Sequence, residues 1–214
     1  MHPSCFQYLG FSWDYNGVTR YFVFTVVPFG LTSGPKVCQI VFKPLLIRWR
    51  AKGIVSIVFY DDGIIGSNSY NSCKIASDQV YSDLVKANVL PNPSKSNWEP
   101  TQKLEWLGFE WDFQQGGVRV TEARMDKFSH RLNTLINICP KVTARSVAKV
   151  VGSLISMHLV VGDKCMLRSR NLQAVINYKH YMEIGWDRRI DIRELHLQEK
   201  VKDELSLIRH SVQN

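Results

Sequence analysis

Two adjacent aspartates, Asp61 and Asp62, are the residues whose type and position most clearly allow chemistry. They directly follow a short apolar run, residues 54–60, which has the composition of a buried strand. Aspartate is depleted in strands, and neighbouring carboxylates repel each other unless water or cations neutralise them. Carboxylate oxygens suit Mg²⁺, and two divalent ions about 3.5–4 Å apart are a recurring device for phosphoryl transfer. The alternative is that Asp-Asp-Gly serves only as a good turn.

The elements expected before this pair are a hairpin and a helix. Two aromatic and β-branched runs, residues 6–13 and 19–27, flank an Asn-Gly pair that tolerates positive φ. Ser33 is a possible cap for the helix that follows, and Pro44 is expected to kink or end that helix. The apolar face of this helix is expected to contain Val37, Ile40, Val41 and Leu45.

After the aspartates the pattern predicts another helix and another hairpin. The helix has its apolar positions at Ala76, Val80, Leu84 and Val85. It is expected to end near Asn88, before a proline-rich loop. Residues 104–113 and 118–120 then have the composition of two paired strands.

From Thr121 the hydrophobic period changes from two to 3.6. Thr121 and Thr143 are possible helix caps, and Gly162 is a possible stop. The expected apolar stripes are Met125, Phe128, Leu132 and Leu135 in the first helix, Val147, Val151, Leu154 and Ile155 in the second, and Leu172, Val175, Ile176, Leu195, Val201, Leu205 and Ile208 in later ones. The best domain boundary is therefore near residue 120, and the predicted fold class is α+β.

The charge of the chain is basic and unevenly placed. The formal charge is +8 over 214 residues. Residues 121–180 hold ten Lys/Arg against three Asp/Glu, whereas residues 181–214 hold six against seven. Such a surplus suits a polyanion, and nucleic acid is the usual one. The alternative is a basic surface that binds no ligand.

Several classes of protein are disfavoured by the sequence. The five cysteines are scattered without a CxxC pair, so we expect free thiols and neither a disulfide framework nor a zinc site. No stretch approaches the roughly 18 apolar residues of a membrane span, and no signal peptide is visible. We therefore expect an intracellular protein, in the cytoplasm or nucleus, with no membrane partner.

Four motifs in order resemble those of retroelement reverse transcriptases. Residues 26–35 resemble the "PFGL…P" signature, and residues 59–62, Phe-Tyr-Asp-Asp, look like the box that binds the catalytic metals. Residues 92–95 resemble a loop with a lysine near the triphosphate, and residues 104–109 look like the hairpin that grips the primer terminus. The resemblance covers roughly residues 6–120. The helical half looks most like the corresponding region of DIRS-type retroelements.

The resemblance implies an architecture and an activity. Residues 1–120 would be the C-terminal part of the polymerase palm, an antiparallel sheet with helices. Residues 121–180 would be a helical thumb, and residues 181–214 the start of a connection region. The implied reaction is two-metal nucleotidyl transfer with Mg²⁺ or Mn²⁺, in which deoxynucleoside triphosphates extend a DNA primer on an RNA or DNA template. The implied partners are the template–primer duplex and the rest of a polyprotein, including fingers and RNase H.

The resemblance also assigns roles to residues. Asp61 and Asp62 would be catalytic metal ligands, and Lys95 would neutralise or protonate the departing pyrophosphate. The other assignments are nucleotide or template binding by Pro28, Phe29 and Gly30, primer grip by Trp106, Leu107 and Gly108, and phosphate contacts by Arg124, Lys127, Arg131, Arg145 and Lys149. The alternatives are a core role for Phe29, a hairpin-core role for Trp106 and Leu107, and plain solvation for the cations.

One element of the family pattern is expected to be missing. In the family a third carboxylate comes from an earlier strand, whereas Asp14 is the only acid before Asp61 and lies in a turn. We therefore expect an interior fragment of a longer polyprotein that is inactive alone. A second hypothesis is a non-catalytic nucleic-acid-binding remnant of a retroelement. A third is an orphan fragment that does not fold stably, because an open sheet edge is left unpaired.

Overall fold

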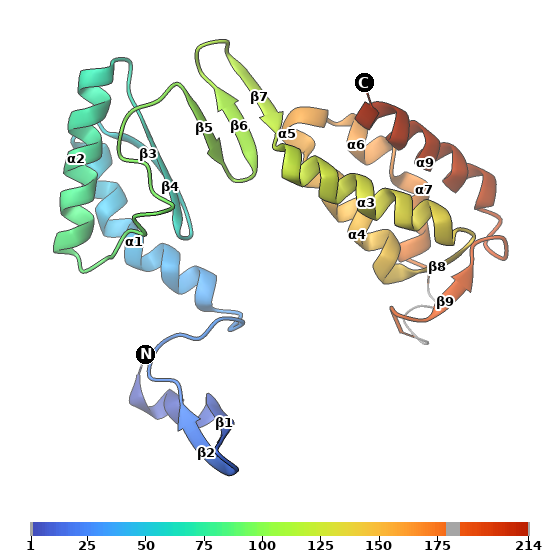
Figure 1. The fold of residues 1–214 in the computed structure, drawn as a ribbon, viewed down its shortest axis with the longest axis horizontal. Helices are drawn as coiled ribbons and strands as arrows, with labels where there is room; N and C mark the ends of the chain where they lie inside the picture. Colours follow the sequence, from blue (N-terminus) through green and yellow to red (C-terminus); the bar gives the residue numbers. More distant parts are fainter. Residues whose placement is uncertain (1, 179–184, 214) are drawn as a thin grey trace. The chain divides into compact units, whose positions relative to one another are not determined.

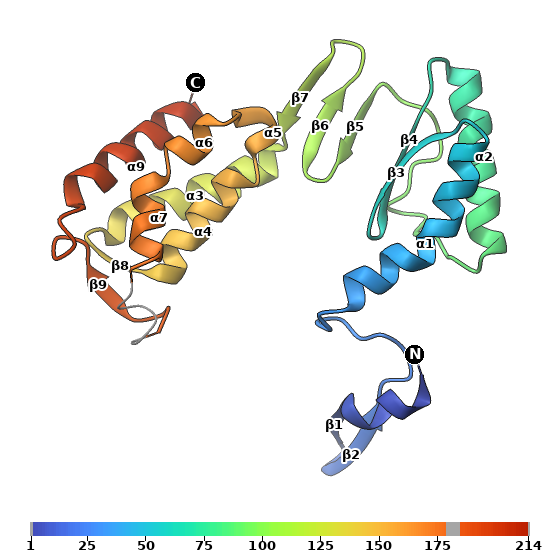
Figure 2. The ribbon, with the colours of Figure 1, turned by 180° about the vertical axis from the view of Figure 1, so that it is seen from behind.

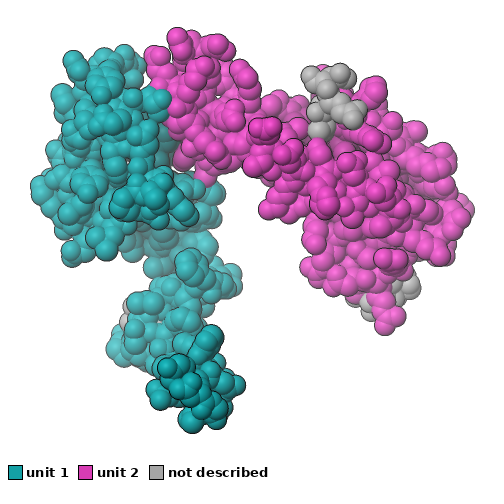
Figure 3. Space-filling model, viewed as in Figure 1, with its two compact units in different colours: residues 1–101 teal, residues 102–214 magenta. Residues whose placement is uncertain are grey.

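The computed structural model describes residues 2–178 and 185–213 (Figure 1). The chain forms two compact units, which we call the first unit, residues 1–101, and the helical unit, residues 102–214 (Figure 3). Both contain helices and small antiparallel sheets, which confirms the α+β class. The predicted boundary between palm and thumb near residue 120 stays a prediction. The predicted boundary between thumb and connection, at residues 180 and 181, lies outside the described residues.

The first unit begins with a short 3₁₀ helix, η1 (Pro3–Tyr8), and a hairpin of β1 (Gly10–Tyr15) and β2 (Val18–Val23). The turn between the strands has Asn16 and Gly17 at φ values of 51° and 75°, as the Asn-Gly pair predicts. The first strand begins later than predicted, because the first residues of the expected run are held in η1, and the second strand ends at Val23 instead of Val27.

Helix α1 (Gly34–Ala51) does not end at Pro44, so that part of the prediction is wrong. The ribbon instead changes direction partway along the helix (Figure 2). Ser33 lies at the N-cap position, but its side chain makes no capping hydrogen bond. Trp49 is the buried residue of α1, near its contact with the following hairpin. The predicted apolar face is not buried, since Val37, Ile40 and Val41 are exposed.

The hairpin that carries the aspartates consists of β3 (Val55–Phe59) and β4 (Asp62–Gly66). The prediction that the first strand is buried is wrong: Val55, Ile57 and Phe59 are 66%, 52% and 47% exposed. The reason is geometric, because side chains of a strand alternate between two faces and here only the face of Ser56 is covered.

Helix α2 (Tyr70–Lys86) packs on β4 and ends before Asn88, which has a φ of 55°, as predicted. Asp83 on this helix is buried and accepts a hydrogen bond of 3.2 Å from Nε1 of Trp49. The loop after α2 folds back along it, with the Ser77 hydroxyl donating to the carbonyl of Trp98 at 2.8 Å. These contacts hold the small core of the first unit.

The helical unit opens with a three-stranded sheet of β5 (Lys103–Trp106), β6 (Phe109–Asp112) and β7 (Gly117–Val120). The sequence pattern predicted two strands here, and this is wrong. A tight turn at Leu107 and Gly108 divides the expected first strand in two.

Helices form the rest of the unit. They are α3 (Glu122–Ile138), α4 (Ala144–Ile155), α5 (His158–Val161), α6 (Lys164–Leu167), α7 (Arg170–Ile176) and α9 (Gln198–Gln213), and the short strands β8 (Lys141–Thr143) and β9 (Arg189–Asp191) pair with each other. Thr143 caps α4 through a capping box with Ser146, as its position predicted. Thr121 lies at the N-cap of α3 without a side-chain capping bond, and Gly162 ends α5 instead of α4. The β8–β9 pair was not predicted.

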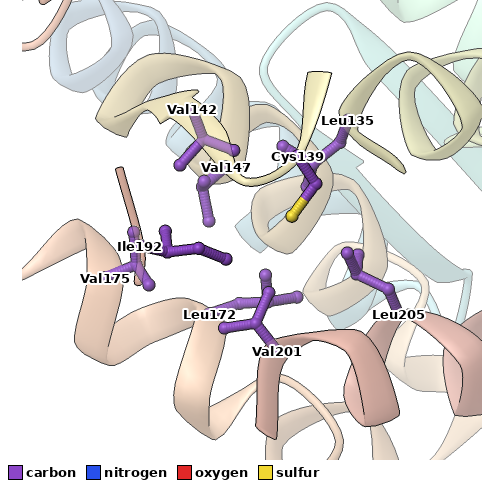
Figure 4. Close-up of a pocket in the computed structure, with 9 residues that line it drawn as sticks. All are labelled: Leu135, Cys139, Val142, Val147, Leu172, Val175, Ile192, Val201 and Leu205. Carbon is purple, nitrogen blue, oxygen red and sulfur yellow. The ribbon is translucent and has the colours of Figure 1, made fainter. Parts of the chain in front are cut away.

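One continuous core fills the helical unit. The predicted stripe of Phe128, Leu132 and Leu135 is 1–2% exposed, which confirms it. In Figure 4 side chains from several elements point toward one another around this core, among them Val147, Leu172 and Leu205. The five cysteines are free thiols, as expected.

Candidate active site

The two aspartates lie at the tip of the β3–β4 hairpin. Phe59 pairs with Asp62, so Tyr60 and Asp61 form the two-residue turn. Both carboxylates are exposed. Within residues 2–178 and 185–213, no side chain or backbone group forms an ion pair or hydrogen bond with either carboxylate. The pair is therefore open to a cation from solution.

The turn holds a strained aromatic residue. Tyr60 has a φ of 58°, a left-handed conformation that costs an ordinary L-residue roughly 1–2 kcal/mol. Glycine is preferred at the first central position of a hairpin turn of this kind. The ring of Tyr60 packs edge-on against Phe59, with 4.4 Å between the ring centres. A bulky residue kept where glycine would relax the backbone points to a functional constraint at this tip.

The aspartates fit a divalent ion in part. Mg²⁺ binds through one or two carboxylates together with waters and substrate phosphates. Among the residues described, no cluster of three or more His, Cys, Asp or Glu side chains is placed to hold a metal. Asp61 and Asp62 would thus supply the protein oxygens for such an ion, and the remaining ligands would come from elsewhere.

Lys95 lies in a structured turn of the first unit. Oδ1 of Asn92 accepts hydrogen bonds from the amide and hydroxyl of Ser94 at 3.0 and 2.8 Å. The Lys95 amide donates to the Asn92 carbonyl at 3.2 Å, and its side chain is exposed. No described contact joins its ammonium group to the aspartates.

The segment of Pro28, Phe29 and Gly30 is exposed at its centre. Phe29 is 109% exposed, so the alternative of a buried core phenylalanine is wrong. Gly30 has a φ of 88°, which favours glycine whatever the surrounding space. The segment therefore presents an exposed aromatic ring beside a glycine whose backbone conformation other residues rarely adopt.

Trp106, Leu107 and Gly108 surround the β5–β6 turn and are half-buried. The Trp106 carbonyl accepts a hydrogen bond of 3.2 Å from Nε1 of Trp111, and the two rings lie 6.2 Å apart. Nε1 of Trp106 is buried, and none of the residues that the structure describes provides a hydrogen-bond partner for it. A buried donor without a partner raises the free energy of the folded chain, so an acceptor placed at this indole N–H would be stabilising.

The five predicted phosphate contacts fall into two groups. The guanidinium groups of three are engaged by the protein: Arg124 with backbone carbonyls, Arg131 with the Ser153 hydroxyl at 2.6 Å, and Arg145 with Asp187 at 2.5 and 3.0 Å. The hydrogen bond with Asp187 raises the pKa of Arg145 and correspondingly lowers that of Asp187. Lys127 and Lys149 are exposed on α3 and α4.

Comparison with known proteins decides the family. The model of the family "Reverse transcriptase (RNA-dependent DNA polymerase)" matches residues 2–111, just over half of the chain. The chain belongs to the reverse transcriptase family. The family assignment made from the four motifs is thereby confirmed, and the DIRS-type placement stays a prediction.

Retroviral polyproteins are among the relatives of this reverse transcriptase chain. The Gag-Pol polyproteins of Rous sarcoma virus subgroup C (strain Prague) and avian leukosis virus subgroup A (isolate RSA) are each 28% identical to it over 93 residues. That of Rous sarcoma virus subgroup B (strain Schmidt-Ruppin) is 27% identical over the same length. The match covers 42% of this chain but only 6% of each polyprotein.

Two features of this reverse transcriptase chain escaped the sequence analysis. One is the strained turn at Tyr60, which a pattern of residue types does not reveal. The other is the contact of Arg124 with the turn at Leu107 and Gly108. The one sign of this turn in the sequence was the Leu-Gly pair, which follows a stretch with the alternating pattern of a strand. None of the described helices is both long and apolar enough to cross a membrane.

Proposed function

We propose that this chain carries the aspartate pair of a reverse transcriptase active site and acts in two-metal extension of a DNA primer on an RNA or DNA template. The observation that carries the proposal is the exposed, unpaired state of Asp61 and Asp62 at a hairpin tip inside the family match. Neighbouring carboxylates in this state need a counter-charge, and a divalent cation supplies it.

The residues of the chain would divide the work. A bound Mg²⁺ or Mn²⁺ would lower the barrier by activating the attacking oxygen and neutralising charge on the transferred phosphate. Asp61 and Asp62 would hold that charge at the hairpin tip. Lys95 would neutralise the departing pyrophosphate or donate a proton to it. Phe29 would pack against the sugar or base of the nucleotide, while Pro28 and Gly30 shape the backbone that approaches it.

The same proposal assigns the rest of the chain. Residues 1–120 would be palm, residues 121–180 thumb and residues 181–214 the start of the connection. Exposed Lys127 and Lys149 would contact the phosphates of the template–primer duplex without reading its sequence. The partners would be that duplex, deoxynucleoside triphosphates and the remainder of a polyprotein, with synthesis in the cytoplasm or nucleus.

Primer extension tests the proposal. In a longer polymerase containing these residues, Asp61→Asn or Asp62→Asn should lower incorporation on primed poly(rA) by about 10³-fold or more, equivalent to about 4 kcal/mol of barrier. Lys95→Ala should slow it about tenfold, whereas Lys86→Ala, an exposed lysine at the end of α2, should not. Normal incorporation by the Asp61 variant would remove the metal-site assignment.

We further propose that residues 1–214 alone are inactive, since the family's third carboxylate is expected on an earlier strand. Purified chain should therefore give background signal with primed poly(rA). Robust incorporation that depends on Asp61 and Asp62 would contradict this.

A second candidate function is nucleic-acid binding without catalysis. The exposed basic residues of α3 and α4 favour it, because lysine and arginine can bind the phosphates of a duplex without a metal ion. It predicts salt-sensitive binding to duplexes that Asp61→Asn leaves untouched and that Mg²⁺ does not modify specifically. If added nucleotide increases duplex binding by the unmodified chain but not by Asp61→Asn, binding without catalysis is excluded and the catalytic function is favoured.

A further inference from the structure

Arg124 joins the β5–β6 turn to the end of helix α4. Its Nη1 donates to the carbonyls of Leu107 and Gly108 at 3.1 and 3.4 Å, and its Nη2 donates to the carbonyl of Ser156 at 2.8 Å. The guanidinium carbon lies 4.7 Å from the centre of the Phe109 ring, a cation–π contact. The planar fork of arginine can make these contacts together, whereas a lysine ammonium acts as a single point charge.

The turn that Arg124 holds is strained. Leu107 and Gly108 both have positive φ, 52° and 73°, in a two-residue hairpin turn where Asn-Gly is the preferred pair. A leucine in this conformation persists only when its surroundings enforce it. The chain contains the same Leu-Gly-Phe triplet at residues 9–11, where Leu9 has a φ of −125°. The triplet therefore does not dictate the turn by itself.

Two further observations show that the contact is built into the fold. A Cβ atom on Gly108 would lie 2.9 Å from Nη1 of Arg124, so the guanidinium occupies the space that a side chain would need. Ser156 is the C-cap residue of α4, and a cation is favoured beside the free carbonyls of a helix C-terminus. Arg124 thus serves the turn and the helix end at once.

We propose that Arg124 is a positioning residue, which fixes the turn of Trp106, Leu107 and Gly108 to the helical unit so that this turn meets the primer terminus. The role in primer binding rests on the proposed function of the chain. It replaces the direct phosphate contact predicted for Arg124 from the sequence, because three backbone carbonyls already accept from its terminal nitrogens.

Hydrogen exchange of the full chain tests the physical contact. In Arg124→Lys the amides of β5 and β6 should exchange on the order of tenfold faster, since charge-assisted hydrogen bonds to the turn are lost. Arg131→Lys is the matched control: the same change on the same helix, at a residue whose guanidinium donates, among the described residues, to the side chain of Ser153 and not to the turn. It should leave β5 and β6 unchanged. Unaltered exchange of β5 and β6 in Arg124→Lys would overturn the proposal.

Gly108→Ala supplies a second variant. It keeps Arg124 but places a methyl group against Nη1 and at a backbone φ of 73°, and for both reasons β5–β6 exchange should again rise while that of α4 and α7 stays slow. If Gly108→Ala leaves both exchange and turn intact, the close approach of Arg124 is not what holds the turn, and the proposal fails.

Binding measurements separate positioning from phosphate contact. Arg124→Lys should lose about tenfold in preference for a recessed primer end over a blunt duplex, with an unchanged salt dependence. If Arg124 instead contacts a phosphate, Arg124→Lys should keep the full preference for the recessed primer end. Arg124→Ala should then reduce the slope of log binding constant against log salt concentration by about one, and that result would contradict positioning. If the unmodified chain binds no duplex at all, the proposed function fails, whereas hydrogen exchange still decides whether Arg124 holds the turn.

Discussion

At the scale of single residues, the molecule separates side chains that stabilise it from side chains left open for chemistry. Glu204 is of the first kind: it is 6% exposed and accepts hydrogen bonds from the amides of Asn171 and Leu172 at 2.7 and 2.9 Å. It thereby caps the start of α7 from helix α9. Asp61 and Asp62 are of the second kind, because no described group satisfies them.

Glu204→Ala should lower the free energy of unfolding by about 2 kcal/mol, because a buried amide donor and a part-buried one lose their acceptor. Urea unfolding of the chain measures this, with Glu199→Ala as control, since Glu199 is exposed and, within the part of the chain that the structure describes, forms its ion pair with Lys202. The control should stay within about 0.5 kcal/mol of the unmodified chain. Equal effects of the two substitutions would show that the cap of α7 contributes little.

What the sequence predicts at this scale depends on whether a residue acts through its type or its neighbours. The aspartate pair was found because two acids after an apolar strand stand out. The alternating pattern around Leu107 was misjudged as one strand, because a tight turn there depends on Arg124, seventeen residues away from Leu107. Phe29 could equally have been core, and only the folded chain shows it exposed.

At the scale of elements, hydrophobic periodicity predicts the buried faces of the helical unit and of α2, where Ala76 and Val80 are buried, but it does not predict the exposure of α1. Phe128, Leu132 and Leu135 form a stripe that finds partners on α4, α7 and α9, so the prediction of a buried face succeeds. Val37 and Ile40 form a comparable stripe on α1 that finds no cover among the described residues. Amphipathic spacing predicts a helix, but burial also requires a partner element.

Asp191, the last residue of β9, forms an ion pair with Arg193, and the effect of this ion pair on stability can be measured through pH. Hydrogen bonds from Arg193 lower the pKa of Asp191 from 3.8 to about 2. The folded chain therefore binds fewer protons than the unfolded chain between these values, so the stabilisation is present above about pH 4 and is lost as pH falls toward 2.

Asp191→Asn should therefore be less stable than the unmodified chain at pH 6 and should lose less stability between about pH 4 and 2. Urea midpoints at several pH values measure both, with Asp203→Asn, an exposed aspartate on α9, as control. Parallel loss of stability in the unmodified chain and in Asp191→Asn would exclude a role for this pair.

At the scale of the whole molecule, the two units differ in how much core each contains. From residue 2 to residue 101, the buried apolar residues are Trp49, Ala76 and Val80, whereas the continuous core cluster lies in the helical unit. Many large apolar side chains of the first unit are exposed, including three on β3. Stability of the chain therefore resides mainly in the helical unit.

Residues 102–214 expressed alone should show a cooperative thermal transition, and residues 1–101 alone should not. Far-UV circular dichroism of both pieces on heating checks this, with the full chain as reference. The result also bears on the hypothesis of an orphan fragment: a sharp transition in residues 1–101 would show that the exposed β3 face does not prevent stable folding.

The central claim is that Asp61 and Asp62 hold a divalent cation at the hairpin tip, and Mn²⁺ titration of the isotope-labelled chain tests it most directly. Paramagnetic broadening should appear first at the amides of residues 60–63 and should be lost in Asp61→Asn and Asp62→Asn. Asp14→Asn is the matched control, because Asp14 lies beside another hairpin turn and already accepts a hydrogen bond of 2.6 Å from Thr19. Broadening that is absent from the tip, or that persists in both tip variants, would contradict the claim.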